Sequence, residues 1–281
     1  MDYTLIENAE AQAWLDLFSA QTESYRQQYG FKLREIGNVW MSSSTAIPFP
    51  HFNCPLGLGI GKAFTEKDLD DMLNAFKEEH ISKFYIHLSP ATEPKTARHW
   101  LMTRGLRQVS SWHRMVRGNI PLPTASGSAI SINTAELGNF DGLTVEDVTF
   151  ENAKEWANFI DVVYHMPTGQ WLLELVNREG WYHAICREGG KIVAARTLRI
   201  NHDGSSYMMI DAPVPGVMTQ RFDPDFMVSQ RLVEVGLAHG VTLFTTDIEK
   251  PSVNQDTPAY HFWAALGFEV AFEKQIGRAH V

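Results

Sequence analysis

Three strand-length segments in the second half constrain the fold of this 281-residue chain more than any other feature. The first two are joined by Gly189-Gly190, and Asn201–Gly204 turns the chain into the third. Paired glycines favour the tight turns of antiparallel hairpins, because glycine takes positive φ without steric cost. The sequence therefore predicts a three-stranded antiparallel meander. Its strands are expected at 181–187, 191–200 and 205–212.

Helices and further strands are expected on both sides of this meander. In the segment 150–164 the apolar residues follow the 3.6-residue period of a helix that is buried on one face. The other elements expected are strand 143–148, helix 169–176, helix 227–239, strand 242–248, helix 256–266 and strand 268–274. Alternating helices and strands of this kind predict a mixed α/β fold.

The first half repeats the end of this order. Its expected elements are strand 54–60, a helix capped by Thr65, strand 83–88, helix 95–104 and strand 111–116. Segments 99–112 and 262–274 match in pattern, which indicates a duplication at a spacing of about 160 residues. We expect one module over 1–118, a Pro-, Ser- and Gly-rich linker over 119–142, and a second module over 143–275. One reading frame of a common sequencing adapter encodes the final string IGRAHV, so we exclude 276–281 as a non-native tail.

Composition excludes several classes of protein. The chain has 24 Lys and Arg against 33 Asp and Glu, a net charge of −9, which argues against nucleic-acid binding. Its two cysteines form no disulfide framework, and its eleven histidines contain no His-Glu-x-x-His, so we expect no metal. We find neither a signal peptide at the N-terminus nor an apolar run of about 18 residues, so we expect a cytoplasmic protein with no membrane partner.

The order of elements in the second half, together with three short strings, resembles the GNAT superfamily of N-acetyltransferases. The strings are GKIVAARTLRI at 190–200, PGVMT at 215–219 and AALGF at 264–268. With the weaker match of the first half, the chain resembles the tandem GNAT subgroup, in which one module is usually degenerate. The resemblance implies two modules, each a central mixed β-sheet flanked by helices. It also implies transfer of an acetyl group from acetyl-CoA to a primary amine of a small molecule or peptide by direct attack.

Pro213 and Pro215 bear on where acetyl-CoA would bind. Both lack a backbone N–H, and their spacing of two places both missing donors on one edge of the strand. In the GNAT resemblance the strands splay apart here, and the pantetheine arm pairs with Val217, Met218 and Thr219. A simpler interpretation is that Pro213–Gly216 ends the strand in a loop. The resemblance also assigns Val228, Ser229 and Trp263 to cofactor binding.

Two features depart from the family pattern. The segment 220–229, where GNAT proteins carry glycines that bind the pyrophosphate, has no glycine, one proline and two aspartates that we expect to repel phosphate. Trp263 stands where the family has the tyrosine that protonates the leaving thiolate, so we assign this role to Tyr260, nearly one helical turn earlier. The candidate bases are Asp211, Asp247 and Glu249, with His165 and His261 as weaker ones.

These features leave two functions open. The first is a GNAT-type N-acetyltransferase whose second module is catalytic. The second is a non-catalytic GNAT-fold protein that binds a ligand or a protein partner, which the missing glycines and Trp263 favour. A tRNA-dependent aminoacyltransferase would need a basic groove, and the chain is acidic.

Overall fold

The computed structural model divides the chain into two compact units. The first comprises Met1–Arg114, Asp247–Lys250 and Val270–Val281, and the second comprises Met115–Thr246 and Pro251–Glu269. The structure describes residues 2–47, 49–122, 140–213, 222–250 and 258–278. Strands β5 (Arg107–Gly118), β10 (Leu243–Glu249) and β11 (Glu269–Arg278) each have residues in both units.

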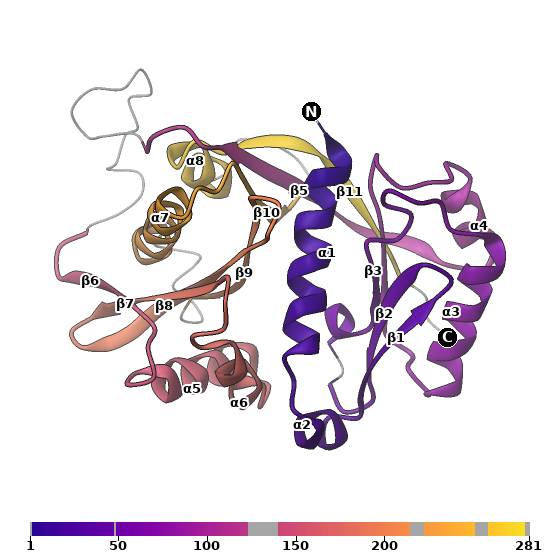
Figure 1. Cartoon of the computed structure of the whole chain (residues 1–281), viewed down its shortest axis with the longest axis horizontal. Coiled ribbons are helices and arrows are strands. Elements are labelled where there is room, and N and C mark those ends of the chain that lie inside the picture. Colours follow the sequence, from indigo (N-terminus) through magenta and orange to yellow (C-terminus); the bar gives the residue numbers. More distant parts are fainter. Residues whose placement is uncertain (1, 48, 123–139, 214–221, 251–257, 279–281) are drawn as a thin grey trace. The chain divides into compact units, whose positions relative to one another are not determined.

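The first unit contains a small antiparallel sheet and four helices (Figure 1). The sheet has the order β1-β2-β3, with Phe31 opposite Ser44 and Trp40 opposite Leu56. A second set of strands has the order β4-β11-β5, in which Leu88 lies opposite Gln275. The elements are α1 (Tyr3–Ser19), α2 (Glu23–Gln28), β1 (Phe31–Ile36), β2 (Val39–Ser44), β3 (Cys54–Leu56), α3 (Glu66–Glu78), β4 (Tyr85–Leu88) and α4 (Ala97–Thr103).

Local signals in the sequence explain the helix starts of this unit. The Asp2 carboxylate accepts hydrogen bonds from the backbone N–H groups of Thr4 and Leu5 at the start of α1. Thr65 and Asp68 form a complete capping box at the start of α3, as the expected Thr65 cap requires. The apolar faces of α3 and α4 pack with β2 and β4 in one core, where the Phe76 and Phe84 rings stack at 4.4 Å.

The second unit contains the predicted meander. Strands β7 (Trp181–Glu188), β8 (Lys191–Ile200) and β9 (Ser205–Pro213) are antiparallel, and β6 (Leu143–Asp147) and β10 complete the order β10-β9-β8-β7-β6. Helices cover both faces of β8 (Figure 1). On one face, Thr197 is hydrogen-bonded to His183, whose ring contacts Trp156 of helix α5. On the other face, Leu198 lies beside Gly236 of helix α7. The helices are α5 (Ala153–Tyr164), α6 (Gly169–Leu172), α7 (Asp223–Ala238) and α8 (Pro258–Ala265). The predicted mixed α/β class is confirmed.

Three expectations about the elements were incomplete or wrong. The strand expected at 54–60 ends at Leu56, because Gly57, Gly59 and Gly61 take φ values of 65°, 71° and 73° and turn the chain. Helix α7 begins four residues earlier than expected, with Pro224 in its first turn. The elements over residues 3–44 were not predicted. Strand β11 extends to Arg278 and so includes the first three residues of the segment 276–281, where Ile276 is buried and lies opposite His87.

None of the helices in the described ranges is both long and apolar enough to cross a membrane.

Candidate functional site

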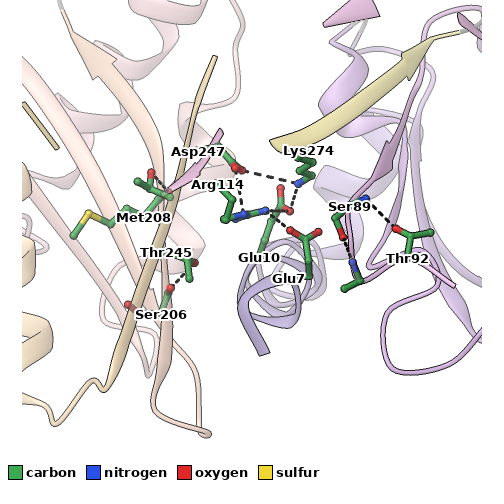
Figure 2. A network of polar contacts seen from close by, with 12 residues as sticks. Glu7, Glu10, Ser89, Thr92, Arg114, Ser206, Met208, Thr245, Asp247 and Lys274 are labelled. Carbon is green, nitrogen blue, oxygen red and sulfur yellow. Dashed lines mark hydrogen bonds and ion pairs between the residues drawn. The ribbon is translucent and has the colours of Figure 1, made fainter. Parts of the chain in front are cut away.

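Strands β9 and β10 of the second unit are paired over a short length. The parallel register joins Ser205–Tyr207 to Leu243–Thr245. Beside this stretch the hydroxyl of Thr245 donates to the carbonyl of Ser206 at 2.7 Å, and that of Thr246 donates to the carbonyl of Met208 at 3.4 Å (Figure 2). Strand β9 continues to Pro213, so its last six residues lie beyond this register with β10. Among the described residues, the ladder between β9 and β10 therefore reaches no further than Tyr207 and Thr245.

A β-bulge occupies the same end of β9. Ala195 lies opposite Ala212 and Thr197 opposite Met209, so that Ile210 and Asp211 together face Arg196. Ile210 has φ +53°, a left-handed conformation that costs about 1–3 kcal/mol in a β-branched residue. Bulges re-aim side chains and concentrate near functional sites. This one places the Asp211 carboxylate beside the guanidinium of Arg196.

Arg196 is the centre of a buried polar cluster. Its Nη2 lies 2.8 Å from Asp211 Oδ1 and 2.9 Å from Asp225 Oδ2, while the arginine itself is 3% exposed. The guanidinium lies 4.8 Å from the centre of the Trp263 ring, a cation–π distance. The Tyr164 hydroxyl donates to the backbone carbonyl of Asp211 at 2.5 Å. Residues from α5, β8, β9, α7 and α8 thus converge here.

Burial and charge shift the acid–base behaviour of this cluster. Burial raises the pKa of Asp225 to about 7, although the Arg196 charge opposes the shift. Burial, and then the Asp211 charge, raises the pKa of the Tyr164 hydroxyl. Burial lowers the pKa of Arg196, but Asp211 and Asp225 outweigh it and raise the pKa overall. Arg196 therefore stays charged, whereas the Asp225 carboxyl group keeps its proton to a much higher pH than an ordinary aspartate.

The structure brings some of the predicted site residues together and separates others. Asp211 and Trp263 both contact Arg196, and the Asp211 side chain is 41% exposed. Tyr260 is half-buried on α8. Val228 and Ser229 are fully buried in α7, so their side chains are parts of the core. Val217, Met218 and Thr219 lie outside the described residues.

The remaining candidate bases lie elsewhere in the chain. Glu249 is exposed at the end of β10 and belongs to the first unit. The Asp247 side chain is 2% exposed and pairs with Arg114 and Lys274 in the first unit. His165 and His261 are exposed.

The expected role of the aspartates in α7 also needs correction. Asp223 is fully buried and Asp225 is 8% exposed, and Asp225 is bound to Arg196. Their charges therefore do not form an exposed acidic start to the helix. Sequence reasoning missed Arg196, although an arginine between the alanines and leucine of an otherwise buried strand indicates a partner in the core.

The first unit has its own buried charge cluster, which the sequence did not predict (Figure 2). Arg114 is fully buried, and its Nη2 lies 2.7 Å from Glu10 Oε2 and 3.3 Å from Glu7 Oε1. Its Nε lies 3.2 Å from Asp247 Oδ1. Lys274 is 1% exposed and donates from Nζ to Glu10 Oε2.

Comparison with known proteins identifies the fold. No protein-family model matches the sequence, and no curated protein matches it. A GCN5-related N-acetyltransferase from Kribbella flavida is similar with a TM-score of 0.58 and 15% identity, over 96% of this chain and 93% of that one. A tandem GNAT protein from the clavulanic acid biosynthesis pathway is similar with a TM-score of 0.53 and 10% identity, over 97% and 95% of the two chains. This chain has the tandem GNAT fold.

A third structure agrees with this assignment. A GCN5-related N-acetyltransferase from Sphaerobacter thermophilus is similar with a TM-score of 0.55 and 13% identity, over 74% of this chain and 66% of that one. At these identities the similarity establishes the fold, and activity has to be argued from the site.

Proposed function

We propose that the second unit transfers an acetyl group from acetyl-CoA to a primary amine of a small molecule or peptide. The observation that carries this proposal is the early end of the β9–β10 pairing, after Tyr207 and Thr245. An extended arm can add to an open strand edge through main-chain hydrogen bonds. The pantetheine arm of acetyl-CoA has amide groups of the kind that such an edge accepts.

The reaction needs one base and one acid. The amine nitrogen attacks the thioester carbonyl carbon, so that a C–N bond forms, the C–S bond breaks and the thiolate leaves. Asp211 would accept the proton that the amine loses, because its carboxylate is partly exposed and lies at the C-terminal end of β9. Tyr260, which is half-buried on α8, would protonate the thiolate.

The start of α7 fits the phosphates of CoA less well. The structure gives this helix no side-chain cap, and Pro224 removes one of the backbone N–H groups that bind anions at helix starts. Arg196, the nearby cation, is occupied by Asp211 and Asp225. These observations support the second candidate, a GNAT-fold protein that binds a ligand without catalysing transfer.

Calorimetric titration of the full chain with acetyl-CoA separates the two candidates. Under the first proposal acetyl-CoA binds, and an assay for free thiol with a panel of primary amines detects turnover. Asp211→Asn should then lower kcat by about a hundredfold or more, the contribution typical of a general base. Asp147→Asn is the matched control, because Asp147 forms an exposed ion pair with Arg231 in the same unit. Absence of binding at millimolar acetyl-CoA would remove the acetyltransferase proposal and leave the second candidate.

A further inference from the structure

The first unit contains a cavity beside its buried charge cluster. The cavity is lined by Glu7, Glu10 and Trp14 from α1, His51, His87 from β4, and Lys274 from β11. All of these residues belong to the first unit. The cavity measures about 20 Å³. A single water needs roughly 10–15 Å³ on this measure, so the space holds a guest the size of one water molecule or of an ammonium group.

The charged groups around the cavity do not balance when all are ionised. Three carboxyl groups, from Glu7, Glu10 and Asp247, face two cations, Arg114 and Lys274. One negative charge is therefore left over in a buried place, which is unfavourable by several kcal/mol unless it is compensated. Either one carboxyl group holds a proton, or a cation enters the cavity.

Glu7 is the carboxyl group that carries this excess. Burial raises its pKa, although the charges of Lys274 and Arg114 oppose the shift, and those of Glu10 and Asp247 add to it. By contrast, the pKa of Glu10 is lowered, because Lys274 and Arg114 outweigh its burial. The Glu7 Oε1 atom is buried and accepts no hydrogen bond from any described residue.

Two neutral imidazoles also line the cavity. Burial lowers the pKa of His51 to about 4 and also lowers that of His87, with the Lys274 charge adding to both shifts. Both ring nitrogens of His51 and Nε2 of His87 are buried without a hydrogen-bond partner among the described residues. The His51 ring is held against Tyr85 and Trp112 at centroid distances of 5.0 and 5.4 Å. Each neutral imidazole offers one lone pair to a donor.

We propose that this cavity binds the protonated amino group of a small primary amine, with Glu7, His51 and His87 as the accepting groups. An ammonium group has three N–H donors, the size of the cavity and the single positive charge that the cluster lacks. A water molecule fits the space but brings no charge, so with water in the cavity the cluster is neutral only while one carboxyl group holds a proton. The described residues contain no group of three or more acidic, His or Cys side chains arranged to hold a metal ion. The proposal concerns the first unit and is independent of acetyl transfer in the second.

Binding should be coupled to loss of a proton. In the free protein Glu7 retains its proton to a higher pH than an ordinary glutamate, and an ammonium group in the cavity favours its ionised form. Calorimetric titration of the full chain with methylammonium, without acetyl-CoA, tests this in phosphate and in HEPES buffer. We expect one saturable site and an enthalpy that differs between the two buffers in the direction of proton release. Tetramethylammonium, which has no N–H and is larger, should not bind.

Glu7→Gln keeps the shape of the side chain and removes its charge, so it should weaken methylammonium binding about tenfold or more and abolish the buffer dependence. Glu35→Gln, the same change on the exposed face of β1, should leave both unchanged. His51→Phe should also weaken binding, and it tests the proposal if Glu7→Gln does not fold. Equal binding of tetramethylammonium, binding without proton release, or an unchanged affinity in Glu7→Gln would overturn the proposal. No saturable heat from methylammonium would do the same and would mean that the cavity holds water. None of these results depends on whether the second unit binds acetyl-CoA.

Discussion

Replacing Arg196 by Met removes the cation that Asp211 and Asp225 share while it keeps most of the side-chain volume. Asp225 is 8% exposed and bonds to Arg196 through both carboxylate oxygens, at 2.9–3.2 Å. Breaking a buried ion pair by removing one partner costs roughly 3–5 kcal/mol, because the other charge is left uncompensated. Asp211 adds little to this cost, since its side chain is 41% exposed and water can replace the arginine.

The size of the loss should depend on pH. Arg196 lowers the pKa of Asp225, so in Arg196→Met this pKa rises above about 7 and the carboxyl group escapes the penalty by taking a proton. We therefore expect a loss of about 3–5 kcal/mol at pH 9 and a smaller loss at pH 5.5. Urea unfolding followed by circular dichroism at the two pH values measures both. Arg196→Met combined with Asp225→Leu should recover much of the loss, because it removes the stranded acid. A loss below about 1 kcal/mol at both pH values would refute the assignment of Arg196 as the partner of a buried charge.

Three further changes test other parts of the structure. The pKa of Asp225 is raised in the folded state from 3.8 to about 7, so the wild-type free energy of unfolding should fall as pH rises between these values; Asp225→Asn should flatten that slope in urea titrations. Gly236→Ala would place a Cβ 2.3 Å from the Phe244 ring and should lower stability by about 1–3 kcal/mol, whereas Gly118→Ala, which meets nothing within 4 Å, should not. Thr65→Ala removes the capping box of α3 and should cost about 1 kcal/mol in the same assay, and an unchanged midpoint would show that the helix start is stabilised in another way.

Much of the second unit could be predicted from local signals. The meander follows from Gly189-Gly190 and the 201–204 turn, because a hairpin is determined by residues close together in sequence. Helix α1 was missed, although Ile6, Ala9, Ala13 and Leu17 are buried and share one face of a helix. An acidic sequence with mixed small residues hides that period, and only packing makes it visible.

The two charge clusters could not be predicted, for a different reason. Arg196 and Asp225 are 29 residues apart, and Glu10 and Lys274 are 264 residues apart. No periodicity or motif joins such positions, because the fold alone brings them together. The same limit explains why Asp225 was expected to face a phosphate: the sequence shows the charge but not the buried arginine that binds it.

Both units thus contain an arginine at the centre of more carboxylate charge than the nearby cations neutralise, but they relieve the excess differently. In the second unit Asp211 is partly exposed, so solvent stabilises one of the two acids beside Arg196, and the pKa of Asp225 stays near 7. In the first unit the Glu7 and Asp247 side chains are 6% and 2% exposed, and water outside the protein can relieve little of their charge. A cavity the size of an ammonium group lies at Glu7, beside both ring nitrogens of His51 and Nε2 of His87, which have no hydrogen-bond partner among the described residues. Of the two clusters, only the one around Arg114 in the first unit has its excess negative charge buried away from solvent. We therefore expect a cationic ligand at that cluster and not at Arg196.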